Sequence, residues 1–108
     1  LYSQDKKNGI LIECMSTWLA GMLTFGNDLD LALNHYYKER KQLLTALSAA
    51  KANVVVISNE VGMGLIGASK LERCFCDEMG LLNQALGTIS AQVIQVSAGF
   101  PLYLKGKA

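Results

Sequence analysis

The sequence predicts an α/β domain in which a mostly parallel sheet is flanked by helices. Two short runs of apolar and branched side chains, at residues 10–15 and 54–57, have the composition of buried strands. Between them, apolar residues recur at helical spacing from 29 to 50, which is typical of a long amphipathic helix. Strands that are separated by helices in this way favour a layered domain.

The first strand is expected at residues 10–15, directly after Gly9, with a helix starting near Trp18. Its acidic residue, Glu13, lies close to the end of the run. A carboxylate at the end of a buried strand is costly unless it binds a partner. From the residues alone, Glu13 could equally accept hydrogen bonds from a helix N-terminus or bind a metal ion.

The long helix follows a break at residues 26–28. His35 lies off its apolar stripe, and its acidic neighbour Glu39 could form an ordinary helix pair with it, so we interpret His35 as a solvated residue. The next strand, at 54–57, shows no alternation of polar and apolar residues, which predicts burial on both of its faces.

Polar residues follow this second strand, where Ser58, Asn59 and Glu60 lead into a turn that contains Gly62 and Gly64. In parallel sheets, ligands bind beyond the carboxyl ends of the strands. Asparagine and glutamate could simply close a turn, but two polar groups directly after a buried strand favour a binding site.

Glycines at positions 62, 64 and 67 formally fit the G-x-G-x-x-G pattern of dinucleotide-binding domains. We reject this interpretation, because the first glycine of that pattern makes a tight turn directly off the strand, whereas residues 58–61 intervene here. The next expected strand, at 93–96, is also not followed by an acidic residue that could hold a ribose.

The rest of the chain predicts one helix and two strands. Ser69 and Glu72 have the spacing of a capping box at a helix start. A strand at 93–96 is followed by a turn and by residues 100–105, where a proline favours a sheet edge. The expected order is strand, helix, helix, strand, helix, strand, strand, in a single α/β domain over residues 1–108.

The composition, with 51% apolar and 18% charged residues among 108, supports one folded domain. A net charge of +1 gives no electrostatic reason to expect nucleic acid or an anionic membrane as a partner. No run approaches the ~20 apolar residues that cross a bilayer. Cys14, Cys74 and Cys76 are odd in number, which favours reduced thiols and a cytoplasmic location over a disulfide framework.

Three segments carry a resemblance to known proteins. Residues 10–19, ILIECMSTWL, look like a Walker B strand and the helix after it. Residues 58–64, SNEVGMG, are followed by G-x-x-N-Q at 80–84, and residues 97–102, SAGFPL, resemble a closing turn. Together they resemble the family of bifunctional adenosylcobinamide kinases and adenosylcobinamide-phosphate guanylyltransferases of cobalamin biosynthesis.

This resemblance implies a P-loop NTPase (RecA-like) fold with a mostly parallel sheet. Members of the family phosphorylate adenosylcobinamide with a nucleoside triphosphate and then transfer GMP from GTP through a guanylylated histidine. The implied catalytic residues are Glu13, which would bind Mg²⁺ that accompanies GTP or ATP, and Glu60. Asn59, Gly62 and Gly64 would bind nucleotide or substrate, and Asn83 would brace their loop from the next helix.

The chain departs from the family pattern because its 108 residues contain no G-x-x-x-x-G-K-[ST] loop. In the family this loop and the guanylylated histidine precede the Walker B strand, so His35 does not inherit the histidine's role. We therefore expect the C-terminal portion of a longer P-loop domain that lacks the N-terminal P-loop strand. Such a chain is expected to be inactive alone, and to work as a homo-oligomer or with the missing segment. The alternative is a degenerate, non-enzymatic homologue that serves as a binding or assembly module.

Overall fold

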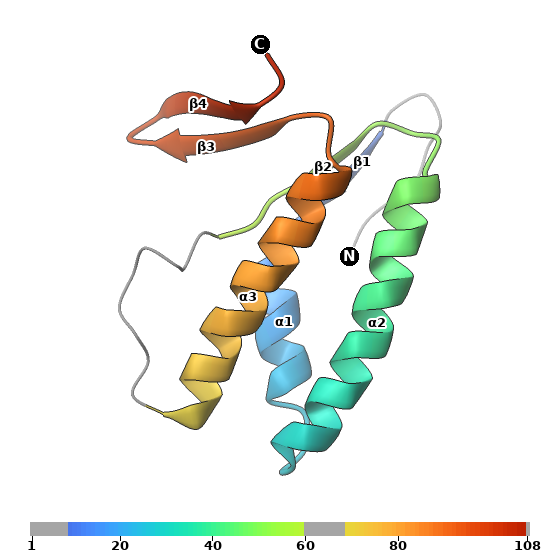
Figure 1. Ribbon diagram of the computed structural model, residues 1–108, viewed down its shortest axis with the longest axis vertical. Coiled ribbons are helices and arrows are strands. Elements are labelled where there is room, and N and C mark those ends of the chain that lie inside the picture. Colours follow the sequence, from blue (N-terminus) through green and yellow to red (C-terminus); the bar gives the residue numbers. More distant parts are fainter. Residues whose placement is uncertain (1–8, 60–68, 108) are drawn as a thin grey trace.

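The computed structural model describes residues 9–59 and 69–107, in which the predicted order of strands and helices is confirmed (Figure 1). The first strand is shorter than the predicted run, and the first helix begins earlier than Trp18. The elements are β1 (Ile10–Ile12), α1 (Met15–Leu23), α2 (Leu29–Ala49), β2 (Val54–Val56), α3 (Lys70–Ile89), β3 (Val93–Ser97) and β4 (Phe100–Lys105).

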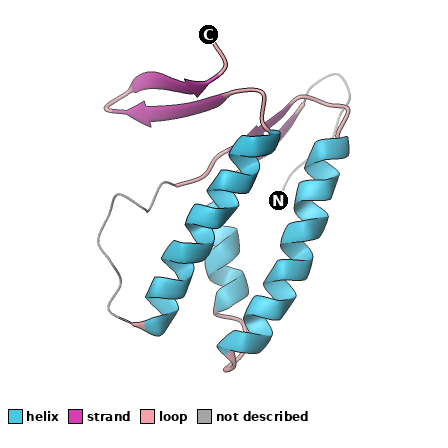
Figure 2. Cartoon of the chain, viewed as in Figure 1, coloured by secondary structure: helices cyan, strands magenta, loops and turns pink. Residues whose placement is uncertain are grey.

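The described strands form two separate sheets, not the single mostly parallel sheet that was expected (Figure 2). β1 and β2 pair in parallel, with Ile12 opposite Val56. β3 and β4 form an antiparallel hairpin, whose turn residues Ala98 and Gly99 have φ angles of 52° and 81°. Two consecutive residues with positive φ are typical of tight hairpin turns. This turn gives β3 a local antiparallel neighbour.

The three helices form a layer against one face of β1 and β2. Figure 1 shows α1 behind α2 and α3, with the short parallel sheet at one end of this layer. Burial of each large apolar side chain contributes about 1.5–3 kcal/mol, so the core is the main source of stability. Its fully buried side chains are Met15, Leu19, Tyr36, Met79 and Leu82.

The outer face of β1 and β2 is exposed, which corrects the prediction that the second strand is buried on both faces. Ile10 and Ile12 are 7% and 2% exposed, whereas Leu11 and Val55 are 51% and 58% exposed. Neighbouring residues in a strand point to opposite faces, and the described helices cover only one of them. The apolar run therefore reflects the strand propensity of branched residues.

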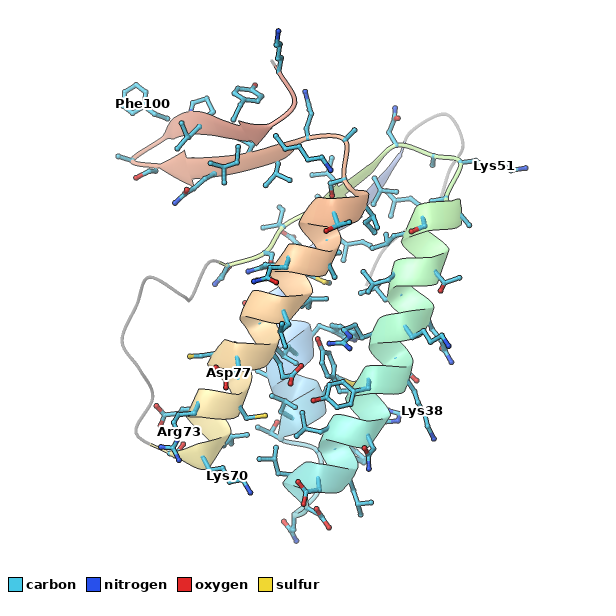
Figure 3. The ribbon with its side chains drawn as sticks, in the orientation of Figure 1. Lys38, Lys51, Lys70, Arg73, Asp77 and Phe100 are labelled. Carbon is cyan, nitrogen blue, oxygen red and sulfur yellow. The ribbon has the colours of Figure 1, made fainter. Side chains whose placement is uncertain are left out.

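The β3–β4 hairpin also exposes apolar side chains. Phe100 is 75% exposed, and Figure 3 shows it at the far end of the hairpin, away from the helices. Lys105 Nζ ties the hairpin to the C-terminal end of α3, where it donates to the carbonyl oxygens of Gly87 at 2.9 Å and Thr88 at 3.1 Å. A cation is favourable there because the helix dipole ends in unpaired carbonyl groups.

Side chains cap the two long helices. Asp28 accepts hydrogen bonds from the backbone N–H groups of Asp30 at 3.0 Å and Leu31 at 3.3 Å, at the start of α2. Ser69 accepts one from the N–H of Glu72 at 3.0 Å, at the start of α3. The N-cap predicted at Ser69 is thus confirmed, and such a cap contributes about 1 kcal/mol.

His35 is exposed on α2, as expected for a solvated helix residue. All three cysteines are free in the structure, and the reduced state of their thiols stays a prediction. Within residues 9–59 and 69–107, no helix has the length and apolar character needed to cross a membrane.

A polar cluster of Tyr36, Tyr37, Arg40 and Glu78 joins α2 to α3. The Tyr37 hydroxyl donates to Glu78 Oε2 at 2.8 Å, and Arg40 Nη1 lies 3.5 Å from Glu78 Oε1. The Arg40 guanidinium also packs over the rings of Tyr36 and Tyr37, at 5.6 and 5.0 Å from their centroids. Because Glu78 is only 8% exposed, these contacts offset part of the cost of burying its charge.

Tyr36 is fully buried in this cluster, and its hydroxyl has no hydrogen-bond partner among the described residues. Burial raises the pKa of Tyr36 from 10.0 to about 12, with the positive charge of Arg40 acting in the opposite direction. The Tyr36 hydroxyl therefore keeps its proton to a higher pH in the folded state than in the unfolded chain.

We expect the free energy of unfolding to fall as the pH rises from 10.0 to about 12, because the unfolded state gains stability when Tyr36 ionises. Below this range, the protonated Tyr36 makes its full contribution to the free energy of unfolding. Its loss amounts to roughly 3 kcal/mol, at ~1.4 kcal/mol for each pKa unit. Urea unfolding at several pH values measures this fall.

Tyr36→Phe is the matched variant for this measurement. It should remove the part of the alkaline destabilisation that belongs to Tyr36. At about pH 8 it should not lower stability, because it deletes a hydroxyl without a hydrogen-bond partner. The same alkaline fall in both proteins would contradict the assignment to Tyr36.

Candidate functional site

The ends of β1 and β2 lie side by side, because hydrogen bonds continue past the last residues of both strands. The N–H of Ile57 donates to the Ile12 carbonyl at 2.8 Å, and the N–H of Met15 donates to the Ile57 carbonyl at 3.0 Å. These bonds bring residues 13–14 next to residues 58–59. Parallel pairing thus assembles the edge where ligands bind in α/β sheets.

Asn83 of α3 holds the segment that follows β2. Its Oδ1 accepts a hydrogen bond from Ser58 Oγ at 2.5 Å, and its Nδ2 donates to the backbone carbonyl of Asn59 at 2.8 Å. A carboxamide has both an acceptor and donors, so one side chain fixes two consecutive residues. Asn83 thus braces the first residues after the strand, whereas the rest of the predicted loop lies outside the described residues, and the contact of Asn83 with nucleotide or substrate stays a prediction.

Cys14 connects the end of β1 to Asn59. Its Sγ lies 2.8 Å from Ser16 Oγ and donates to Asn59 Oδ1 at 3.5 Å. The hydrogen bond with the Ser16 side chain, helped by the backbone N–H groups of Ser16 and Thr17, lowers the pKa of the Cys14 thiol from 9.0. The sequence interpretation missed this role, since Cys14 was assigned to a buried strand. The available signal was its position directly after Glu13 at a strand end.

The sequence interpretation assumed that Glu13 is buried and needs a partner to offset the cost. In the structure Glu13 is exposed at the end of β1, so its carboxylate does not need such a partner. Among the described residues, no three His, Cys, Asp or Glu side chains are grouped closely enough to hold a metal ion. The predicted site residues Glu60, Gly62 and Gly64 lie outside the described residues, and their roles stay predictions. Glu13 and Asn59 follow neighbouring strands, and Asn83 contacts Asn59 from α3.

An open pocket of about 590 Å³ adjoins these residues, between α1 and Asn59. Its surface is mainly apolar, on α1 and α3, with a smaller polar part that carries hydroxyl and carboxamide groups. Its lining includes Ser16, Thr17, Thr24 and Asn59 on the polar side, with Gly21 and Phe75 on the apolar side. Phe75, Thr17 and Gly21 had not been assigned to a site from the sequence.

These features define an α/β protein with a polar site beyond the carboxyl ends of two paired parallel strands, supported by a carboxamide from the following helix. The chain belongs to the cobinamide kinase / cobinamide phosphate guanyltransferase family, whose family model matches residues 1–104. The resemblance drawn from the sequence motifs is thus confirmed.

Three bacterial relatives are each a bifunctional adenosylcobalamin biosynthesis protein. The chain is 32% identical over 98 residues to CobP of Pseudomonas aeruginosa, covering 91% of this chain and 54% of the relative. It is 33% identical over 104 residues to CobU of Escherichia coli, with 89% and 58% covered. It is 31% identical over 106 residues to CobU of Salmonella typhimurium, with 91% and 59% covered. The chain thus spans a little over half the length of these relatives.

We expect Asn83→Ala to lower the free energy of unfolding by about 1 kcal/mol, because it removes the hydrogen bonds to the partly buried Ser58 hydroxyl and to the exposed Asn59 carbonyl. Gln84→Ala is the matched control, since Gln84 is the neighbouring amide residue on α3 and is exposed. The control should change stability by less than about 0.5 kcal/mol. Urea unfolding measures both variants, and equal effects would contradict the bracing role.

We also expect iodoacetamide to alkylate Cys14 faster than Cys74. The hydrogen bond with Ser16 lowers the pKa of Cys14, whereas burial, with a further contribution from Glu78, raises the pKa of Cys74. The thiolate is the reactive form of cysteine. Mass spectrometry after partial alkylation at about pH 8 measures the ratio.

Two controls separate this effect from simple accessibility. Ser16→Ala should slow the alkylation of Cys14 in the folded chain, and the two cysteines should react at similar rates once the chain is unfolded in urea. Faster alkylation of Cys74 in the folded chain would contradict the expected order.

Proposed function

We propose that this chain acts in cobalamin biosynthesis as part of a cobinamide kinase and cobinamide phosphate guanylyltransferase. The proposal is supported by the combination of the family match and the geometry of the strand edge. The family match extends over residues 1–104, and within it Cys14, Asn59 and Asn83 meet at a strand edge suited to ligand binding. We place this edge in a RecA-like P-loop domain, by resemblance to the family.

Glu13 is the residue that we propose to hold Mg²⁺, which would arrive with GTP or ATP. Protein sites hold Mg²⁺ through one or two carboxylates, together with waters and phosphate oxygens. An exposed carboxylate at a strand end fits this requirement. Bound Mg²⁺ neutralises charge on the phosphoryl group during transfer. Glu60 is proposed as the second catalytic carboxylate.

Asn59, Gly62 and Gly64 are proposed to contact nucleotide or substrate, with Asn83 as a positioning residue. Asn59 is suited to this role because Asn83 fixes its backbone and the Cys14 thiol contacts its side chain. Enzymatic phosphoryl transfer depends mainly on positioning and electrostatic stabilisation. A residue that is held from both strands and from α3 can present its carboxamide in one orientation.

We propose that the 108-residue chain is inactive alone, because it has no G-x-x-x-x-G-K-[ST] loop to hold a triphosphate. Activity would require adenosylcobinamide, a nucleoside triphosphate and a segment that supplies this loop and the family's histidine. Self-association is a further part of the proposal, and the cytoplasm is the proposed location.

Calorimetry on the chain alone should therefore detect no micromolar binding of GTP with Mg²⁺. Joined to a family segment that carries the phosphate-binding loop, the chain should phosphorylate adenosylcobinamide in a Mg²⁺-dependent reaction. Glu13→Gln should then lower kcat roughly 100-fold, because a neutral amide is a weaker ligand for the cation that stabilises the transition state.

Glu39→Gln is the control, since Glu39 is an acidic residue on α2 outside the proposed site. It should leave kcat unchanged. An undiminished kcat for Glu13→Gln would remove Glu13 from the site. A joined protein without activity would favour the alternative that the chain is a non-enzymatic homologue.

A further inference from the structure

The carboxamide of Asn59 ends a chain of hydrogen bonds that begins on α1. Ser16 Oγ lies 2.8 Å from Cys14 Sγ, and Cys14 Sγ donates to Asn59 Oδ1 at 3.5 Å. A thiol has a single proton, which Cys14 donates to Asn59, so the Ser16 hydroxyl is the donor in the first contact. The two bonds therefore run in one direction, from Ser16 through the sulfur to the carboxamide oxygen.

The start of this chain is fixed by the core. Ser16 lies in the first turn of α1, directly after Met15, which is only 1% exposed. The backbone of Cys14 belongs to the same turn, because its carbonyl accepts hydrogen bonds from the N–H groups of Thr17 at 3.1 Å and Trp18 at 3.2 Å. The thiol is thus attached to a backbone position that is set by the packing of α1.

The side chain of Asn59 needs a partner of its own. Asn83 fixes the backbone carbonyl of Asn59, but this bond leaves the side chain free to rotate about χ1 and χ2. Asn59 is exposed, and exposed side chains exchange rotamers on the picosecond-to-nanosecond timescale. The bond from the Cys14 thiol to Oδ1 acts on the carboxamide itself and restricts this exchange.

The same bond determines which end of the carboxamide faces away from Cys14. Oxygen and nitrogen are the two branches of a planar carboxamide, so a hydrogen bond to Oδ1 turns Nδ2 away from the thiol. While the thiol donates, Nδ2 in place of Oδ1 would set one donor against another. Nδ2 carries two N–H donors and no acceptor. Asn59 therefore presents donors, which match an oxygen atom that accepts hydrogen bonds.

From these contacts we propose that Cys14 and Ser16 are positioning residues, which hold the Asn59 carboxamide so that its Nδ2 donates to an acceptor oxygen of the ligand. This inference rests on the proposed function, in which Asn59 contacts nucleotide or substrate, and adds how Asn59 is oriented. Cys14 acts only as a hydrogen-bond donor, and its sulfur does not react. Such support matters because a contact that is misplaced contributes less to the transition state.

NMR on the 108-residue chain tests this orientation without any ligand. Three-bond couplings from Asn59 Cγ to the backbone nitrogen and carbonyl carbon report its χ1 rotamer. We expect a single rotamer in the unmodified chain and exchange between rotamers in Cys14→Ala. Cys14→Ser keeps a donor and should restore the single rotamer. Ser16→Ala should give partial averaging, because the thiol then loses the bond that orients it.

Cys76→Ala is the matched control, since Cys76 is also a free, half-buried cysteine but lies on α3. It should leave the Asn59 rotamer unchanged. A single Asn59 rotamer in Cys14→Ala, or averaged rotamers in the unmodified chain, would overturn the proposal. Should Cys14→Ala fail to fold, which the amide spectrum reveals, Ser16→Ala decides, and an Asn59 rotamer that is unchanged in it would overturn the proposal.

A double-mutant cycle in the joined protein tests whether Cys14 acts through Asn59. Alone, Cys14→Ala should lower kcat/KM for the phosphorylation of adenosylcobinamide roughly tenfold, about the effect of one hydrogen bond. In a protein that already carries Asn59→Ala, it should have no further effect, because the group that it positions is gone. A merely structural role would lower kcat/KM by the same factor in both backgrounds, which would overturn the proposal.

Asn59→Asp tests the donor role of Nδ2. The aspartate keeps the shape of the side chain and an acceptor for Cys14, but replaces the N–H donors with an oxygen atom. Its kcat/KM should be no higher than that of Asn59→Ala, and a value close to that of the unmodified protein would overturn the assignment to Nδ2. A joined protein without activity would reject the proposed function instead, and the Asn59 rotamers of the chain alone would still decide whether Cys14 positions Asn59.

Discussion

The structure of the candidate site depends most on the side chain of Asn83, which joins the core helix α3 to the end of β2. Its neighbour Leu82 is fully buried, so the position of α3 is set by the core. Asn83 fixes Ser58 and Asn59 relative to this helix through two hydrogen bonds. The Cys14 thiol then connects Asn59 to the end of β1. Two strands and one helix are thereby held in one arrangement, which is the support that a ligand-binding site requires.

The same helix organises the rest of the helical layer. Near the middle of α3, Glu78 accepts a hydrogen bond from the Tyr37 hydroxyl and forms an ion pair with Arg40, both from α2. The adjacent residue Met79 and Leu82 pack in the core. A buried carboxylate is costly unless its partners lie in one geometry. α3 is therefore fixed against α2 by a polar cluster and against β2 by a carboxamide.

Local signals were sufficient to predict the order of the elements and the cap at Ser69, because helical spacing and capping depend on residues close in sequence. The exposure of Leu11 and Val55 could not be predicted, since an apolar strand face has the same sequence whether or not another layer covers it. The polar residues after β2 and the brace from Asn83 could be predicted from the strand end and from the family motif. The role of Cys14 was missed, because a thiol within an apolar run has the pattern of a core residue, and its position directly after Glu13 was the one signal to the contrary.

The most direct test of the central claim is a double-mutant cycle between Ser58 and Asn83. The free energy of unfolding would be measured for the unmodified chain, Ser58→Ala, Asn83→Ala and the double variant. We predict a coupling of about 1 kcal/mol, because the two single substitutions remove the same hydrogen bond. Additive effects would show that the two side chains do not interact in solution, and the strand edge would then lack the support from α3 described above.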